Sequence, residues 1–61
     1  MKRVDLIRLI ESFGCDLIRH GSNHDWYRNR VTGVSQPVPR HREINERLAQ
    51  HIIRVLNSDE D

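Results

Sequence analysis

Apolar residues recur at helical spacing near both ends of the chain. Between Lys2 and Phe13 they lie three and four residues apart with charged residues between them, which predicts an amphipathic helix. Gly14 follows, and glycine readily adopts the left-handed conformation that ends a helix. The same spacing predicts a second helix from about Asn45 to Asn57, with Asn45 as its N-cap. The apolar positions expected to face the core are Leu6, Ile7, Leu9, Ile10 and Phe13 in the first helix, and Ile44, Leu48, Ile52, Val55 and Leu56 along the second.

Three shorter segments between the helices are typical of β-strands. They run from Cys15 to His20, from 24 to 29 and from 34 to 39, and turn residues separate them. Regular alternation places Cys15, Leu17 and Arg19 on one face of the first strand. The third strand contains two prolines, which cannot donate ladder hydrogen bonds, so we expect it at an edge of the sheet. The order predicts an α+β fold with a three-stranded antiparallel sheet and both helices on one face.

Length and composition limit the classes of protein that the chain can represent. Its 61 residues suffice for one small domain, 1–61, with a marginal core. The single cysteine, Cys15, excludes an internal disulfide and a zinc site built on several thiolates. No apolar run approaches the roughly 20 residues that cross a bilayer. We therefore expect a cytoplasmic protein without a membrane partner, with a frayed acidic tail at 58–61.

Positive charge is concentrated in the middle of the chain, although the formal net charge is only +1. Between Arg19 and Arg42 there are five arginines but only one acid, Asp25. The planar guanidinium group suits bidentate contact with phosphate. This distribution is compatible with an ordinary solvated surface, but it also predicts a phosphate-binding face.

The turn before the second strand carries the residues best suited to chemistry. Its backbone N–H groups can be presented to an anion, and His24 follows at once on a rigid strand. Histidine can give or take a proton near neutral pH, so the arrangement suits cleavage of an RNA phosphodiester whose 2′-OH is the nucleophile, without a metal or other cofactor. The candidate RNA- or phosphate-binding residues are Arg19, Gly21, Ser22, Asn23, Arg28, Arg40, His41 and Arg42.

Other roles for these residues remain open from the sequence. His24 also fits a surface or capping role, and a metal held by His20 and His24 would lack a convincing third ligand. Asp25 should point to the strand face opposite His24, which argues against a catalytic triad. One of the adjacent aromatics Trp26 and Tyr27 must face the core, which leaves the other as a possible base-stacking surface.

Several motifs occur together in an order that resembles the HicA toxin family, over roughly residues 3–57. They are Gly21-Ser22-Asn23-His24-Asp25-Trp26-Tyr27, Val38-Pro39-Arg40-His41-Arg42-Glu43-Ile44 and Leu48-Ala49-Gln50-His51-Ile52. The resemblance implies a fold similar to the double-stranded RNA-binding domain. It also implies a small toxin that cleaves mRNA without a metal and is neutralised by a HicB antitoxin covering the active site. His24 matches the family's catalytic histidine, and His41 matches a second histidine for which RNA contact or loop structure is the expected role.

The leading hypothesis is therefore an endoribonuclease toxin whose partners are mRNA and a HicB-like antitoxin. A lone histidine cannot be acid and base in one step, so the second role falls to water, an arginine-stabilised oxyanion or an unidentified group. A non-catalytic RNA-binding module of the same fold is the main alternative. A domain that acts only through a protein partner is a third.

Overall fold

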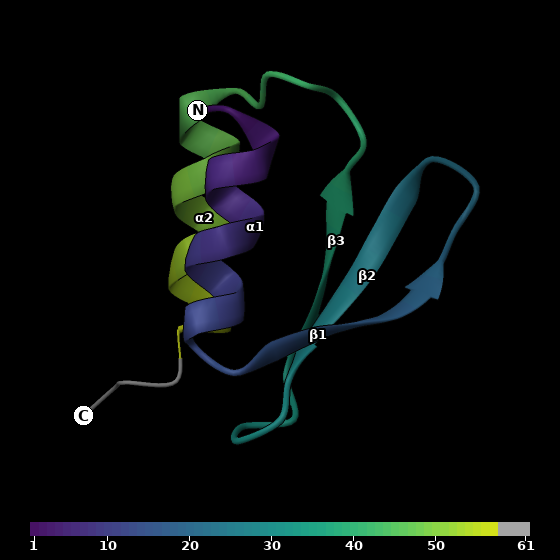
Figure 1. Cartoon of the computed structure of the whole chain (residues 1–61), viewed down its shortest axis with the longest axis vertical. Coiled ribbons are helices and arrows are strands. Elements are labelled where there is room, and N and C mark those ends of the chain that lie inside the picture. The colour runs from purple at the N-terminus through teal and green to yellow at the C-terminus, as the bar shows by residue number, and fades with distance from the viewer. Residues whose placement is uncertain (58–61) are drawn as a thin grey trace.

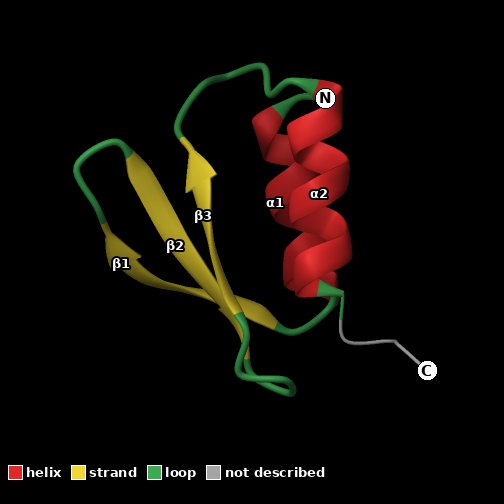
Figure 2. Cartoon of the chain, turned by 180° about the vertical axis from the view of Figure 1, so that it is seen from behind, coloured by secondary structure: helices red, strands yellow, loops and turns green. Residues whose placement is uncertain are grey.

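The computed structural model describes residues 1–57, and the acidic tail predicted to fray lies outside them. Helix α1 (Arg3–Ser12) is followed by strands β1 (Cys15–His20), β2 (His24–Asn29) and β3 (Ser35–Pro39), and then by helix α2 (Glu46–Leu56). The strands form one antiparallel sheet in the order β1-β2-β3, and both helices lie on the same side of it (Figures 1 and 2). The predicted α+β fold is confirmed, with the proline-containing β3 at an edge.

Both helices begin and end where their local chemistry predicts. Gly14 has φ +97°, in the left-handed region, directly after the C-cap residue Phe13. At the start of α2, the Asn45 side chain accepts hydrogen bonds from the backbone N–H groups of Arg47 at 2.9 Å and Leu48 at 3.3 Å. These bonds satisfy two of the amides that the first turn of a helix leaves unpaired. No helix within residues 1–57 is both long and apolar enough to cross a membrane.

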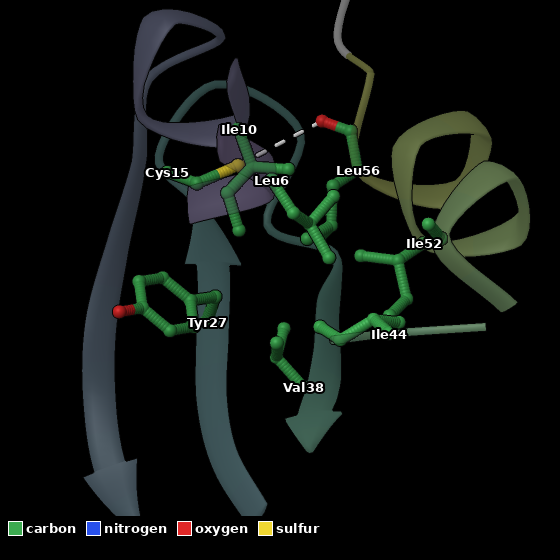
Figure 3. Close-up of a cluster of buried hydrophobic side chains, with 9 residues drawn as sticks. Leu6, Ile10, Cys15, Tyr27, Val38, Ile44, Ile52 and Leu56 are labelled. Carbon is green, nitrogen blue, oxygen red and sulfur yellow. Dashed lines mark hydrogen bonds between the residues drawn. The ribbon is translucent and has the colours of Figure 1, made fainter. Parts of the chain in front are cut away.

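The core lies between the helix pair and the inner face of the sheet (Figure 3). The prediction that Leu48 faces this core is wrong, because its side chain is 39% exposed. The buried face of α2 is instead formed by Ala49, Ile52 and Leu56, whose spacing of three and four residues keeps them on one side of the helix. The buried apolar residues are Leu6, Ile10, Cys15, Tyr27, Val38, Ile44, Ala49, Ile52 and Leu56.

One buried polar side chain connects the end of β2, the β2–β3 turn and the end of α2, all of which lie in the lower part of Figure 1. Asn29, at the end of β2, is completely buried and donates a 2.8 Å hydrogen bond to the Leu56 carbonyl at the end of α2. Its side-chain oxygen accepts from the Val31 amide at 2.7 Å and the Thr32 amide at 3.3 Å in the β2–β3 turn. The side chain therefore fixes both the turn and the helix end.

Strand β1 does not keep a regular alternation. Leu17 is paired with Tyr27 and Arg19 with Trp26, so Ile18 has no partner in this ladder and the register shifts there. Because residues opposite one another in antiparallel strands share a face, Arg19 lies with Trp26 rather than with Leu17. The prediction that Leu17 and Arg19 share a face is therefore wrong, since a bulge adds one residue between them.

Candidate functional site

Two loops meet at the end of the molecule where β2 begins and β3 ends (top of Figure 1). His24 opens β2 and is paired with Pro39, so the chain that leaves β3 starts beside it. Asn23, His24, Arg40 and His41 line a surface cleft of about 420 Å³. The cleft thus combines the turn singled out from the sequence with the loop after β3.

A buried carboxylate lies beneath this end of the sheet. Asp25 is only 7% exposed, and its Oδ2 accepts a 2.7 Å hydrogen bond from Nη2 of Arg3. Its Oδ1 accepts from Nδ1 of His20 at 2.8 Å and from Nε of Arg40 at 2.9 Å. The hydrogen bond from His20 and then that from Arg40 hold the pKa of Asp25 below its ordinary value, since both favour the charged carboxylate.

Arg40 clamps the turn that carries His24. Besides its bond to Asp25, its guanidinium group donates to the carbonyl oxygens of Gly21, Ser22 at 3.1 Å and His24 at 3.4 Å. Most of its donors are thus engaged within the protein, where the sequence analysis expected a phosphate ligand. Its positive charge still lies in the wall of the cleft.

The turn leaves two amides with no acceptor in the described chain. The Gly21 N–H donates to the His24 carbonyl at 2.7 Å, so it is not free to bind an anion. Within residues 1–57, the backbone N–H groups of Ser22 and Asn23 make no hydrogen bond. Gly21 does not have a positive φ, but a Cβ there would lie 3.0 Å from the His24 oxygen and 3.4 Å from Nε1 of Trp26. A side chain at this position would push its neighbours apart by a few tenths of an ångström, which favours glycine.

The His24 ring is open to solvent at the cleft. Its side chain is exposed and has no hydrogen bond or ion pair with any other residue of the described chain. The neighbouring Asp25 is buried on the other face of β2, as the alternation predicted, so these two residues do not form part of a triad. His41 is also exposed and has no side-chain partner within residues 1–57.

The other candidate arginines lie on two separate surfaces. On the face of the sheet away from the helices, the Arg19 guanidinium lies 5.4 Å from the ring centroid of Trp26, a cation–π distance, and Arg28 is exposed. Arg42 lines a groove of about 940 Å³ together with Lys2, Arg3, Val4, Ile7, Arg40 and Glu43. Within residues 1–57, no carboxylate pairs with Arg19, Arg28 or Arg42.

The Cys15 thiol and the two aromatic residues of β2 lie in positions that suit a structural role. The Cys15 thiol contacts the Leu56 carbonyl at 3.8 Å, and burial raises its pKa, which disfavours a nucleophilic thiolate (Figure 3). Tyr27 is buried and Trp26 half-buried on the opposite face, as predicted for adjacent aromatics on a strand. Residues 1–57 contain no group of three or more histidine, cysteine or acidic side chains placed to bind a metal ion.

The hydrogen-bond network around Asp25 was not predicted from the sequence. The sequence did contain a signal. Asp25 lies two residues before Tyr27 on the same strand, so both side chains lie on the inner face of β2. A carboxylate there requires cationic partners to offset its lost hydration. The identity of those partners could not be read from spacing, since Arg3 and Arg40 are 22 and 15 residues away.

Comparison with known proteins gives one informative result. Neither a curated protein nor a solved structure matches the chain. A family model described as the HicA toxin of bacterial toxin–antitoxin systems matches residues 4–57, which is most of the chain. With a family match that covers nearly all of α1 and every later strand and helix, the chain belongs to the HicA toxin family, the toxin component of bacterial toxin–antitoxin systems.

Proposed function

We propose that this protein is a metal-independent endoribonuclease that cleaves mRNA, with His24 as a proton-transfer residue. The observation that carries the proposal is the exposed imidazole of His24, which has no hydrogen-bond partner within residues 1–57 and lies at a turn clamped by Arg40. A histidine with no protein partner has its ring nitrogens available to a substrate. The clamp limits the motion of the backbone that carries it, which favours a defined reacting geometry.

The same turn can hold the scissile phosphate. The amides of Ser22 and Asn23, which have no acceptor in the described part of the chain, would donate to a non-bridging phosphate oxygen, and the charge of Arg40 would stabilise the negative charge that develops during cleavage. Gly21 contributes by letting the turn approach the His24 carbonyl closely rather than by donating to the anion. The 2′-OH next to the phosphate would be the nucleophile, so DNA would not be cleaved.

Arg19, Arg28 and Arg42, which pair with no carboxylate within residues 1–57, would bind the rest of the RNA backbone. Arg19 and Arg28 lie on the open face of the sheet, and Arg42 lies in the groove that shares Arg40 with the cleft. Such contacts release counterions, so RNA binding should weaken steeply as salt rises. His41 in the cleft wall completes the set of RNA-contacting residues.

A HicB-like antitoxin is the protein partner that we propose. An acidic surface on the partner would complement these arginines and speed association. Because Asn23 and His24 line the cleft, a partner segment that filled it would block the approach of the substrate to His24. We propose that the toxin meets its antitoxin and mRNA in the cytoplasm.

The decisive experiment compares the purified protein with its His24→Ala variant on labelled RNA in the presence of a chelator. We expect the variant to lose about 100-fold or more in cleavage rate, the range typical of general acid–base groups. His51→Ala is the matched control, because His51 is exposed on α2 and away from the cleft. An undiminished rate for His24→Ala would refute the role of His24. RNA binding without any cleavage by the parent protein would favour a non-catalytic binding module.

A further inference from the structure

The cleft contains a second imidazole on a different element. His24 comes from the start of β2 and His41 from the loop after β3, yet both line the same depression. Transesterification of RNA needs a base that takes the 2′-OH proton and an acid that protonates the departing 5′-oxygen. One imidazole cannot perform both tasks in a single step, whereas two can.

The residues on both sides of His41 are held by hydrogen bonds. On one side, the Arg40 guanidinium is bonded to Asp25 and to the β1–β2 turn. On the other, the Arg42 carbonyl accepts a 2.8 Å hydrogen bond from the Arg3 amide. His41 is the single residue between these two anchors, so its Cα has little freedom to move away from the cleft. Within the described chain, its side chain makes no hydrogen bond or ion pair that would occupy a ring nitrogen.

His20 is the competing candidate, and its surroundings make it less suitable. Its Nδ1 is bonded to Asp25, and its pairing with that residue places it on the inner face of the sheet. His24 lies on the outer face and lines a cleft in which His20 takes no part. The bulge in β1 is responsible for this separation, because it places His20 beside the buried carboxylate.

We propose that His41 is the second proton-transfer residue of the cleavage reaction, acting with His24; this rests on the proposed ribonuclease function. One histidine accepts the 2′-OH proton as the 2′-oxygen–phosphorus bond forms. The protonated partner donates a proton to the 5′-oxygen as the phosphorus–5′-oxygen bond breaks. The products are a 2′,3′-cyclic phosphate and a 5′-hydroxyl end, and proton exchange with water restores both imidazoles.

The first test separates proton transfer from phosphate contact. His41→Ala should lower kcat about 100-fold or more. His41→Arg keeps a cation that can contact phosphate but cannot exchange a proton near neutral pH. It should therefore bind a 2′-deoxy, uncleavable RNA within about threefold of the parent and yet remain as slow as the alanine variant. A normal kcat for either variant, or a loss confined to KM, would overturn the proposal.

The second test uses an RNA in which sulfur replaces the bridging 5′-oxygen at the cleavage site. A thiolate leaves without protonation, so this substrate no longer needs the general acid. We expect it to restore the rate of only one variant, His24→Ala or His41→Ala, and thereby to identify the acid. Restoration of both variants, or of neither, would contradict a division of acid and base between these two residues.

The two proposals fail in different ways. If the parent protein does not cleave RNA, or if His24→Ala is fully active, the ribonuclease assignment itself is wrong. If His24→Ala is inactive while His41→Ala cleaves at the parental rate, only the role of His41 is wrong. Because His41 is exposed and unpartnered in the described chain, its substitution should leave the unfolding midpoint within error of the parent.

Discussion

Replacement of Asn29 by alanine should be among the most destabilising polar substitutions in the protein. The side chain is completely buried and makes two short hydrogen bonds, to the Leu56 carbonyl at 2.8 Å and from the Val31 amide at 2.7 Å. Each is worth about 1 kcal/mol net. Within residues 1–57, the Leu56 carbonyl would then keep only the weak Cys15 thiol donor at 3.8 Å, and a buried acceptor left without a good partner costs a further 1–3 kcal/mol or so.

The expected loss is therefore at least about 3 kcal/mol in the free energy of unfolding. For a domain of this size that corresponds to a fall of about 12–24 °C in Tm. A domain this small has roughly 5 kcal/mol in total, at the low end of the usual range, so the variant should be partly unfolded at physiological temperature.

Urea denaturation followed by circular dichroism measures this difference. Asn23→Ala is the matched control, since it deletes the same group from an exposed side chain with no hydrogen bond to the described chain, and it should change stability by less than about 0.5 kcal/mol. A loss below about 1 kcal/mol for Asn29→Ala would refute the argument that these bonds hold the β2–β3 turn to the end of α2.

Three further predictions concern the clamped turn. Arg40→Lys keeps the positive charge but loses the planar guanidinium group that bonds to the turn. RNA cleavage should therefore slow by about 10–100-fold in a single-turnover assay, and an unchanged rate would mean that Arg40 does not position His24. Gly21→Ala places a methyl group 3.0 Å from the His24 carbonyl oxygen and beside Trp26, so the turn must shift. The cleavage rate should therefore fall by at least about tenfold, and full activity would show that the close approach is dispensable. The lowered folded pKa of Asp25 means that its charged form stabilises the fold fully above its unfolded pKa of about 3.9, and that this stabilisation is lost as pH falls through the folded value. The urea midpoint should therefore fall on acidification, and Asp25→Asn should flatten that fall; equal slopes for the two proteins would contradict it.

The Asp25 network links the fold to the site. It joins α1 through Arg3, the loop after β3 through Arg40, and the end of β1 through His20. The three donors balance the negative charge of the buried Asp25 carboxylate and also satisfy its hydrogen-bond acceptors. The same residues that hold the sheet end to the first helix thus also set the position of the turn before His24.

The helices, strands and their order were all predictable from local pattern. Apolar spacing identified both helices, Asn45 and Gly14 marked their ends, and the prolines of β3 predicted an edge strand. These features depend on neighbours a few residues apart, and such interactions are visible in a linear sequence. The sequence also singled out His24 and its turn as the candidate for chemistry.

The arrangement around His24 depended on contacts between distant segments. The unpaired residue Ile18 in β1 places His20 beside Asp25 and Arg19 over Trp26. The spacing of residues in the sequence does not predict such a bulge. From the sequence, Arg40 was a candidate phosphate ligand, but in the folded chain its guanidinium group donates to carbonyl oxygens of the β1–β2 turn.

The primary structure alone thus determined the class of fold, the element boundaries and the residue type most suited to proton transfer. Tertiary structure decided which arginines are engaged, which amides remain free and which second histidine shares the cleft. The physical reason is that a hydrogen bond or a shared cleft depends on distances of a few ångströms between atoms, and only the packing of the sheet against the helices brings residues so far apart in the chain to those distances.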